Sequence, residues 1–340
     1  MNKFHLILKG SNKNMASFEF EELFKTYYST EIKLREYKNI LYYFDNHKSL
    51  DKSSEIFKRL TFTNYLGIEI FRFNSLNEFK TKLSDKVLSQ FNFKSFLVRL
   101  KKYKSGLNSE FSEKDIAEII WDKLENPKVD LFNPEMEFTI LLRDDCYILC
   151  ETLYNNSKDY LNRMPKKRPV QMPYTLKSDM ARASINFLGI RDGVVLDPFC
   201  GIGGILLEAY DMGFNIIGND ISWNDLKYMK TNFSYYYPNY KPNILLSDSR
   251  YQFLKDNSVD GIVSDIPYGK SSRMLGLELY EKFLISSSKM LKKNSRMVII
   301  FANFVEFRDL ALKYFNEVKT INQYINKSMT RHIIVLENTK

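Results

Sequence analysis

Short apolar runs alternate with helix-like stretches throughout the C-terminal half of the chain. The apolar runs are typical of buried parallel strands and occupy residues 194–196, 214–218, 243–246, 259–263 and 297–301. The stretches between them predict helices over 179–187, 205–212, 222–237, 277–291 and 305–315. Residues 317–325 and 332–336 predict a closing hairpin. This order predicts a doubly wound, mostly parallel sheet, whose ligands bind at the carboxyl ends of its strands.

The N-terminal half has the same two patterns in shorter pieces. Strands are predicted over 3–9, 40–44, 65–73 and 95–101, followed by a hairpin of 138–142 with 146–150. Helices are predicted over 15–25, 51–59 and 76–87, and a further one begins after the N-cap Ser112. Short mixed elements of this kind indicate α+β structure, with a ferredoxin-like arrangement over residues 1–50.

The whole chain has 340 residues, which predicts two or three domains. We expect α+β structure over 1–50 and 51–152, a linker over 153–178 and the doubly wound domain over 179–340. The linker carries Arg163, Lys166, Lys167 and Arg168 among Pro165, Pro169 and Pro173. Prolines favour an extended, stiff segment, and four neighbouring cations suit phosphate contacts. The alternative is a solvated connector without a ligand.

Composition narrows the function classes. The formal net charge is +9, which favours a polyanionic partner such as nucleic acid. No run of 18 apolar residues and no signal-like N-terminus are found, so we expect a cytoplasmic protein without a membrane span. Three cysteines and three dispersed histidines fit small buried residues in a reducing compartment and argue against a metal site or a histidine-based triad.

A glycine turn follows the first strand of the doubly wound half. That strand ends at Asp197, and after Pro198 come Gly201, Gly203 and Gly204, which open a helix. Glycines let the backbone turn tightly and approach a ligand, and the free N–H groups of a helix start favour an anionic or carboxylate ligand. Asp220 ends the second strand, where an acid accepts hydrogen bonds from ribose hydroxyls. The pattern predicts a ribose-containing cofactor, although a plain connecting turn is the alternative.

Two more strand ends carry acids. Asp248 and Ser249 follow the third strand, and Asp265 begins the sequence Asp-Ile-Pro-Tyr-Gly after the strand 259–263. Each acid alone could simply cap a helix, but all of them lie at the strand ends where the fold binds its ligand.

Together, D-P-F-C-G-I-G-G and D-I-P-Y-G resemble the motifs of the class I S-adenosylmethionine (SAM) methyltransferases that modify exocyclic base nitrogens. The resemblance implies SAM as the cofactor. The residues that it places at the cofactor are Asp197, Pro198, Gly201, Gly203, Gly204, Asp220, Ile221, Asp248 and Ser249. It places the reaction at Asp265, Ile266, Pro267 and Tyr268, with Tyr268 stacking on a flipped base.

In such a site, Asp265 and the carbonyl of Ile266 would accept hydrogen bonds from the target amine and stabilise the charge that develops on it. Asp265 would then take the proton, directly or through water. Ile266 departs from the proline that the family usually has, which adds an N–H group that needs a partner. Lys270 and Arg273 follow and are candidates for phosphate contacts, or for a solvated surface.

The N-terminal half adds a second resemblance. A helix, then V-D-L-F-N-P-E, then the hairpin resembles the THUMP domain, which we assign to 51–152 and which implies binding of the 3′ acceptor end of tRNA. The linker text N-R-M-P-K-K-R-P-V-Q-M-P-Y-T-L is similar to that of archaeal tRNA guanine N2-methyltransferases, with Tyr174-Thr175 in place of Gly-Ser. The chain is thereby identified as resembling the tRNA (guanine-10 N2) methyltransferases, which add one or two methyl groups.

Three rival functions remain open at this point. The related enzymes that methylate guanosine 6 of tRNA usually carry Asn where this chain has Asp265. A DNA amino-methyltransferase is disfavoured by the THUMP-like region. A tRNA-binding protein with a degenerate methyltransferase site is supported by Ile266 alone. We expect a monomer that needs no metal.

Overall fold

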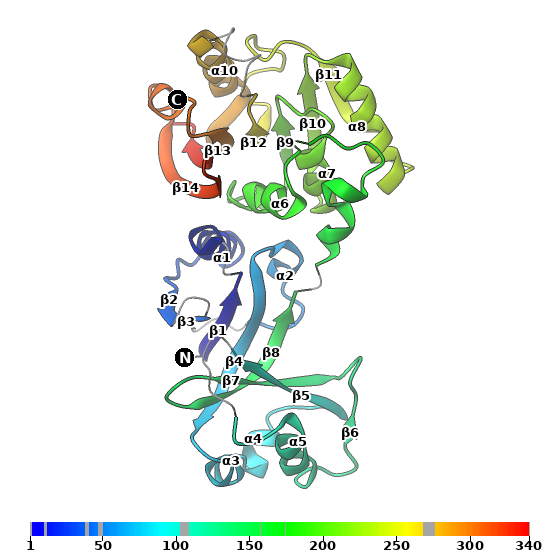
Figure 1. The fold of residues 1–340 in the computed structure, drawn as a ribbon, viewed down its shortest axis with the longest axis vertical. Coiled ribbons are helices and arrows are strands. Elements are labelled where there is room, and N and C mark those ends of the chain that lie inside the picture. Colours follow the sequence, from blue (N-terminus) through cyan, green and yellow to red (C-terminus); the bar gives the residue numbers. More distant parts are fainter. Residues whose placement is uncertain are drawn as a thin grey trace. The chain divides into compact units, whose positions relative to one another are not determined.

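The computed structural model describes residues 2–9, 12–37, 41–46, 50–102, 109–156, 158–173, 175–267 and 276–339. It divides into two compact units, which Figure 1 draws in the colours of the sequence. Unit 1 comprises residues 1–13, 32–57 and 63–156. Unit 2 comprises residues 14–31, 58–62 and 157–340. The tRNA-related residues Tyr268, Lys270 and Arg273 of the sequence prediction lie outside the described residues.

Unit 1 is built on an eight-stranded sheet in the order β2-β3-β1-β4-β8-β7-β5-β6. The strands are β1 (Asn2–Leu8), β2 (Arg35–Tyr37), β3 (Leu41–Asn46), β4 (Thr63–Phe73), β5 (Ser95–Lys102), β6 (Lys128–Val129), β7 (Met136–Leu142) and β8 (Tyr147–Asn155). β1 pairs antiparallel with both β3 and β4, and β4 pairs antiparallel with β8. One sheet therefore joins the segments 1–50 and 51–152, and the predicted boundary at residue 50 does not coincide with a division of the structure.

The short helix α2 (Ile56–Arg59) precedes β4. The helices that follow β4 pack on one end of the sheet and are α3 (Leu76–Lys82), α4 (Asp85–Leu88) and α5 (Glu113–Trp121). Ser112 caps α5 in a capping box with Asp115, as its sequence position predicts. The core beneath these helices is rich in phenylalanine, with Phe73, Phe96 and Phe138 fully or almost fully buried. This α+β unit covers most of the residues for which the ferredoxin-like and THUMP segments are predicted.

Unit 2 is built on a seven-stranded sheet in the order β11-β10-β9-β12-β13-β15-β14. Its strands are β9 (Val194–Asp197), β10 (Asn215–Asp220), β11 (Asn243–Leu246), β12 (Val259–Asp265), β13 (Leu291–Ala302), β14 (Asn316–Asn326) and β15 (Met329–Glu337). The first five run parallel to one another, and β14 and β15 form the closing antiparallel hairpin. The predicted doubly wound, mostly parallel sheet with a closing hairpin is confirmed.

The helices of unit 2 lie on both faces of this sheet. They are α1 (Lys13–Tyr28), α6 (Ser178–Asn186), α7 (Gly204–Asp211), α8 (Trp223–Tyr236), α10 (Gly276–Met290) and α11 (Arg308–Ala311). Along β13, Met297, Ile299 and Phe301 pack in one cluster with α10 and α11, and the alternate residues Val298 and Ile300 are also fully buried. A strand buried on both faces reads as a continuous apolar run, which explains the sequence pattern.

Two segments from early in the sequence belong to unit 2. Phe18 of α1 packs against Phe187 with ring centroids 5.0 Å apart, and Glu19 accepts a 2.8 Å hydrogen bond from the Asn186 side chain. Residues 58–62 lie beside them, where Arg59 donates to Asn186 over 3.0 Å. Unit 2 therefore includes a helix that the sequence analysis assigned to the N-terminal domain.

Three predicted elements differ from those observed. The helix predicted over 51–59 is limited to α2, the one over 76–87 is split into α3 and α4, and the one over 305–315 is reduced to α11. The linker, predicted to be extended, instead holds the 3-10 turns η2 (Asp159–Arg163) and η3 (Pro165–Lys167). No helix in the described part of the chain is long and apolar enough to cross a membrane.

Candidate active site

Four acidic residues lie at the carboxyl ends of the parallel strands of the unit 2 sheet, as predicted. Asp197 ends β9, Asp220 ends β10, Asp248 follows β11 and Asp265 ends β12. In the strand register, Asp197 lies opposite Gly218 and Asp220 lies opposite Leu246. Because the four strands are parallel neighbours, their ends form one continuous edge, and the acids converge there.

The glycine loop between β9 and α7 requires glycine at two positions. Gly201 has φ +50° and Gly203 has φ +83°, the left-handed region that side chains disfavour. At Gly203 a Cβ would also come within 2.7 Å of the Met229 side chain. Gly203 is the N-cap of α7 and offers no side chain to the first turn, so the helix start presents bare backbone N–H groups.

Asp220 holds this loop in place. One carboxylate oxygen accepts a 2.8 Å hydrogen bond from the Gly201 N–H, and the other accepts a 2.9 Å bond from the Ser222 N–H. Burial raises the pKa of Asp220, and these two backbone donors oppose that rise. A carboxylate has about four acceptor sites, so two are left for hydroxyl donors such as those of a ribose.

Asp197 is buried and held by two donors. Its Oδ1 accepts hydrogen bonds from the Ser264 hydroxyl at 2.6 Å and from the Phe199 N–H at 3.2 Å. Burial raises the pKa of Asp197 to about 7, with small further contributions from the charges of Asp220 and Asp265. Its buried carboxyl stands at the strand end where a positively charged ligand is favoured over a negative one.

Asp248 and Ser249 are already engaged within the protein. Arg250 holds Asp248 through two bonds of 2.9 and 2.6 Å, and this hydrogen bonding lowers the pKa of the Asp248 carboxyl. The buried hydroxyl of Ser249 donates to the Pro198 carbonyl over 2.5 Å. Ser249 therefore braces the loop rather than offering its hydroxyl to a ligand, which corrects its predicted role.

The structure adds Asn219, which the sequence analysis missed. Its buried amide donates to the Pro198 carbonyl at 3.3 Å, to the Ser247 carbonyl at 3.0 Å and to the Ser249 hydroxyl at 2.9 Å. Asn219 thus joins the ends of three strands. The available signal was a polar amide inside an otherwise apolar strand, directly before Asp220.

An apolar rim flanks these acids. Ile221 is 71% exposed and Leu246 is 54% exposed, and Leu246 pairs in register with Asp220 on the neighbouring strand. Exposed aliphatic side chains next to a ribose-binding carboxylate suit the faces of a purine ring. The cofactor contact of Ile221 stays a prediction, and Leu246 is an exposed neighbour that the sequence analysis did not name.

The segment after β12 continues the sheet by one more hydrogen bond. The Ile266 N–H donates to the Ile300 carbonyl over 3.1 Å, directly after the register pair of Asp265 with Ile300. The extra N–H that comes with isoleucine thus has a partner in β13. Next along the chain, the Pro267 carbonyl accepts a 2.8 Å bond from the Tyr280 hydroxyl of α10, which fixes the backbone beyond Asp265.

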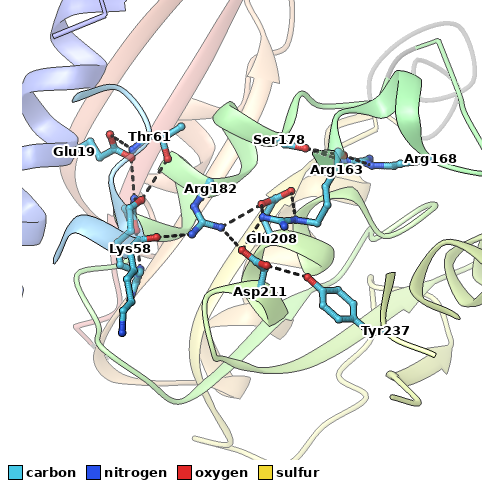
Figure 2. Close-up of polar contacts among 12 residues, drawn as sticks. Glu19, Lys58, Thr61, Arg163, Arg168, Ser178, Arg182, Glu208, Asp211 and Tyr237 are labelled. Carbon is cyan, nitrogen blue, oxygen red and sulfur yellow. Dashed lines mark hydrogen bonds and ion pairs between the residues drawn. The ribbon is translucent and has the colours of Figure 1, made fainter. Parts of the chain in front are cut away.

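Arg163 and Arg168 do not form the predicted surface for phosphates. Both side chains are buried, and Figure 2 shows them within unit 2. Arg163 forms ion pairs with Glu208 at 2.9 Å and Asp211 at 2.6 Å, and these carboxylates raise its pKa although burial opposes them. Arg168 instead donates to the Arg163 carbonyl and to the Ser178 hydroxyl. The charge pattern of the linker does not reveal that Arg163 pairs with two acids on α7. Lys166 and Lys167 are exposed, as predicted.

Arg182 completes this buried ion network. From α6 it contacts Glu208 at 3.3 Å and Asp211 at 2.7 Å, and it donates to the Lys58 carbonyl over 2.6 Å (Figure 2). The network of Arg163, Arg182, Glu208 and Asp211 ties the linker, α6 and α7 together directly behind the glycine loop. Among the described residues, no group of three or more His, Cys, Asp or Glu side chains is arranged to hold a metal ion.

Comparison with known proteins gives consistent results. The RMKL-like methyltransferase domain family matches residues 165–332, and a DNA methylase family matches residues 5–231. A tRNA (guanine(10)-N2)-dimethyltransferase of Methanothermobacter thermautotrophicus is 30% identical over 286 residues, which cover 82% of this chain and 84% of the relative. A protein of the same name from Methanocaldococcus jannaschii is 30% identical over 298 residues, which cover 78% of this chain and 82% of the relative.

More distant relatives share parts of the chain or the fold. A bovine U6 snRNA (guanine-N(2))-methyltransferase is 31% identical over 177 residues, covering 51% of this chain and 33% of that protein. The crystal structure of TrmN from Thermus thermophilus covers 99% of each chain with a TM-score of 0.54 and 18% identity. At that identity the structural likeness shows the fold alone.

Proposed function

Since this chain belongs to the tRNA (guanine(10)-N2)-dimethyltransferase family, we propose that it transfers methyl groups from SAM to the exocyclic N2 of guanosine 10 in tRNA, once or twice. The observation that carries the proposal is the convergence of Asp197, Asp220 and Asp265 at one sheet edge beside a glycine loop. We place the enzyme in the cytoplasm and expect it to act as a monomer.

The residues at this edge fit SAM. The free acceptor sites of Asp220 suit the ribose hydroxyls, and the exposed Ile221 and Leu246 suit the two faces of adenine. Asp248, although held by Arg250, is the nearest acid for the adenine amino group. The bare backbone of Gly203 and Gly204 leaves room for the methionine part. When bound, SAM supplies an electrophilic methyl group.

Asp265 and the Ile266 carbonyl are the proposed acceptors for the target amine. The lone pair of guanine N2 is delocalised into the ring, so the amine is a poor nucleophile. Two acceptors for its N–H bonds draw the nitrogen toward tetrahedral geometry and stabilise the positive charge that develops on it. Asp265 then accepts the released proton. The bonds from Ile266 to β13 and from Tyr280 to Pro267 hold this backbone in place, which supports positioning of the amine to within tenths of an ångström.

Unit 1 carries a surface that suits single-stranded RNA. A cavity of about 440 Å³ is lined by Arg99, Lys101 and the aromatic Phe132, which is 96% exposed. The Asp130 carboxylate accepts hydrogen bonds from the Phe132 and Asn133 N–H groups, both at 3.0 Å, and so fixes the turn that presents this ring. A rigid exposed aromatic side chain beside cations is the arrangement on which unpaired bases stack. We assign it to the acceptor end of tRNA, with Lys166, Lys167, Lys270 and Arg273 as further phosphate contacts and Tyr268 stacking on the target base.

The test is transfer of labelled methyl groups from SAM to unmodified tRNA transcripts, with nucleoside mass spectrometry and mapping of the product. We expect N2-methylguanosine and N2,N2-dimethylguanosine at position 10. Asp265→Ala should lower the rate by about 100- to 1000-fold, the range for loss of one charge-stabilising group, and leave SAM affinity unchanged. The matched control is Asp192→Asn, an exposed acid two residues before the other end of β9, which should retain full activity.

Other outcomes assign other functions. Methylation at guanosine 6 would move the target and keep the mechanism, and transfer to a U6 RNA transcript alone would replace tRNA as the substrate. Tight binding of SAM and tRNA without transfer to any RNA would contradict the enzymatic function and leave a tRNA-binding protein.

A further inference from the structure

Two segments of unit 2 contain no acidic residue. Residues 160–178 and residues 226–247 are free of Asp and Glu, although the whole chain has 41 of these residues. The first segment carries five Lys or Arg residues and the second carries three. Each segment is therefore a local concentration of positive charge.

Hydrogen bonds join these two segments in the folded chain. The Tyr236 hydroxyl of α8 donates to the carbonyls of Asn162 and Lys167, over 3.0 and 3.2 Å. The side chain of Asn232 accepts a 3.0 Å bond from the Val170 N–H and donates to the Val170 carbonyl over 3.3 Å. Both segments belong to unit 2. The fold thus combines them into one region, although the bonded residues are more than 60 positions apart in the chain.

The outward side of α8 carries cations and an aromatic ring. Trp223, Lys227 and Lys230 are exposed and stand at i, i+4 and i+7, so they lie along one stripe of the helix. The Nζ atoms of Lys227 and Lys230 lie 5.8 and 5.4 Å from the centre of the Trp223 ring. Among the described residues, neither lysine forms an ion pair with a carboxylate. In Figure 1, α8 lies beside β10 and β11 of its sheet.

Tyr235 adds an exposed ring that is held in place. It is 64% exposed, and its ring meets that of Tyr236 edge-on, with centroids 4.9 Å apart. Because Tyr236 is bonded to the linker, this ring stands close to the turn η3, which carries the exposed Lys166 and Lys167. A fixed aromatic ring near cations suits the face of a base or a ribose.

The acids that flank this region do not neutralise it. Asp211 contacts Arg163 at 2.6 Å and Arg182 at 2.7 Å, and it accepts a 3.0 Å bond from the Tyr237 hydroxyl (Figure 2). Asp225 is half-buried in the first turn of α8, and the helical repeat places it opposite the exposed stripe. The positive charge of the stripe is therefore available to a partner.

We propose that the outward side of α8 binds the ribose-phosphate backbone of the RNA substrate, next to the linker lysines. That the substrate is RNA rests on the proposed function. Lys227 and Lys230 contact phosphates as point charges, and Tyr235 packs against a base or a ribose. α8 begins three residues after Asp220, so this surface starts at the sheet edge that carries the candidate active site. RNA that enters the site can therefore also contact α8.

The test is filter binding of unmodified tRNA transcripts over a range of salt concentrations. Lys227→Gln combined with Lys230→Gln should raise the Kd by about 5- to 50-fold at about 0.1 M salt. It should lower the slope of log affinity against log salt by about 1.5, because each lost phosphate contact removes about 0.7 to 0.9. The affinity for S-adenosylhomocysteine and the kcat at saturating tRNA should not change.

The matched control is Lys313→Gln combined with Lys327→Gln. These exposed lysines flank β14, which is at the opposite end of the sheet from β11, and their loss changes the net charge equally. The control should keep the wild-type Kd and salt slope. Tyr235→Ala should raise the Kd by at least about 5-fold with an unchanged salt slope, because packing against a base is not ionic.

An unchanged Kd and salt slope in the Lys227 and Lys230 variant, or an equal change in the control, would overturn the inference. If the wild type still methylates tRNA in that case, the proposed function stands without this surface. Conversely, lysine-dependent tRNA binding without methyl transfer would contradict the proposed function and support the α8 surface.

Discussion

At the end of β12, Ile266 shows how a single departure from a motif is accommodated. A proline at this position has no N–H, whereas isoleucine has one, and the structure directs it to the Ile300 carbonyl over 3.1 Å. The carbonyl of residue 266 is present with either side chain. The substitution therefore adds one sheet hydrogen bond next to Asp265 without removing an acceptor from the site.

The buried carboxyl of Asp197 makes stability depend on pH. Its pKa of about 7 in the folded chain compares with an ordinary value of 3.8. Between these values the folded chain binds more protons than the unfolded chain, so the free energy of unfolding falls as pH rises, by up to about 4 kcal/mol from this group. Asp197→Asn should lack this decrease in the free energy of unfolding with pH. Urea unfolding at pH 5 and pH 7.5 measures the decrease in each protein.

The control for this measurement is Asp192→Asn, which should keep the wild-type slope because its carboxylate is exposed. If the free energy of unfolding changes equally with pH in the wild type and in Asp197→Asn, Asp197 is ionised over the whole range from pH 5 to pH 7.5.

The positions of candidate residues were predictable where the backbone determines them. Asp197, Asp220 and Asp265 follow from strand ends and a glycine turn, which local sequence reports. Arg163 and Arg168 are buried and do not form the predicted phosphate surface, because a charge in a linker does not show what will be folded against it. Arg163 pairs with Glu208 and Asp211, more than 40 residues later, and Arg168 bonds the Arg163 carbonyl and the Ser178 hydroxyl.

At the level of elements, the ion network holds α6, α7 and the linker together. Glu208 is fully buried between Arg163 and Arg182. Glu208→Gln leaves two buried guanidinium groups with one acid, Asp211, and should lower the free energy of unfolding by about 3–5 kcal/mol. Chemical denaturation measures this loss. The exposed pair of Glu278 with Lys282 supplies the control, since Glu278→Gln should change stability little.

The turn after β6 is a second element with a testable role. Phe132→Ala should weaken tRNA binding by about 5- to 100-fold, the effect of losing one base stacked on an aromatic ring, and leave S-adenosylhomocysteine affinity unchanged. Filter binding of labelled tRNA measures it. Tyr324→Ala removes an aromatic ring that is 70% exposed on β14 and is the matched control. Unchanged tRNA affinity in Phe132→Ala would exclude this cavity from RNA binding.

Elements were predicted well where hydrophobic periodicity is strong, as in the five parallel strands and in α5. The structure of the linker was predicted wrongly, because prolines permit both an extended chain and the 3-10 turns that are observed. Long-range hydrogen bonds favour the turns. Tyr236 of α8, for example, donates to the carbonyls of Asn162 and Lys167. Such bonds lie beyond a local sequence window.

At the scale of the whole molecule, the catalytic unit is not a contiguous C-terminal domain. A fragment of residues 158–340 lacks α1 and residues 58–62, and so exposes Phe187 and leaves Asn186 without its bonds to Glu19 and Arg59. We expect this fragment to be insoluble or to unfold without a cooperative transition, as followed by circular dichroism. A full-length chain with Phe18→Ala should fold but lose about 3–5 kcal/mol of stability.

A fragment 158–340 that is as stable as unit 2 in the full-length chain would contradict this division. The sequence analysis assigned α1 to the N-terminal domain, together with its neighbours in the chain. Hydrophobic periodicity identifies the apolar face of a helix but does not show which part of the protein covers that face.

The recruitment of α1 also determines when this protein can fold. The ion pair of Glu22 with Arg296 joins residues 274 positions apart, so the native contacts of α1 have a very high contact order. At 5–20 residues per second, a ribosome needs on the order of 10 to 50 s to travel from α1 to β13. During that time residues 58–62 and Phe187 are synthesised one after the other, and the contact of α1 with β13 is the last of these to become possible. Unit 2 can therefore be completed only late in synthesis, after β13 has been made.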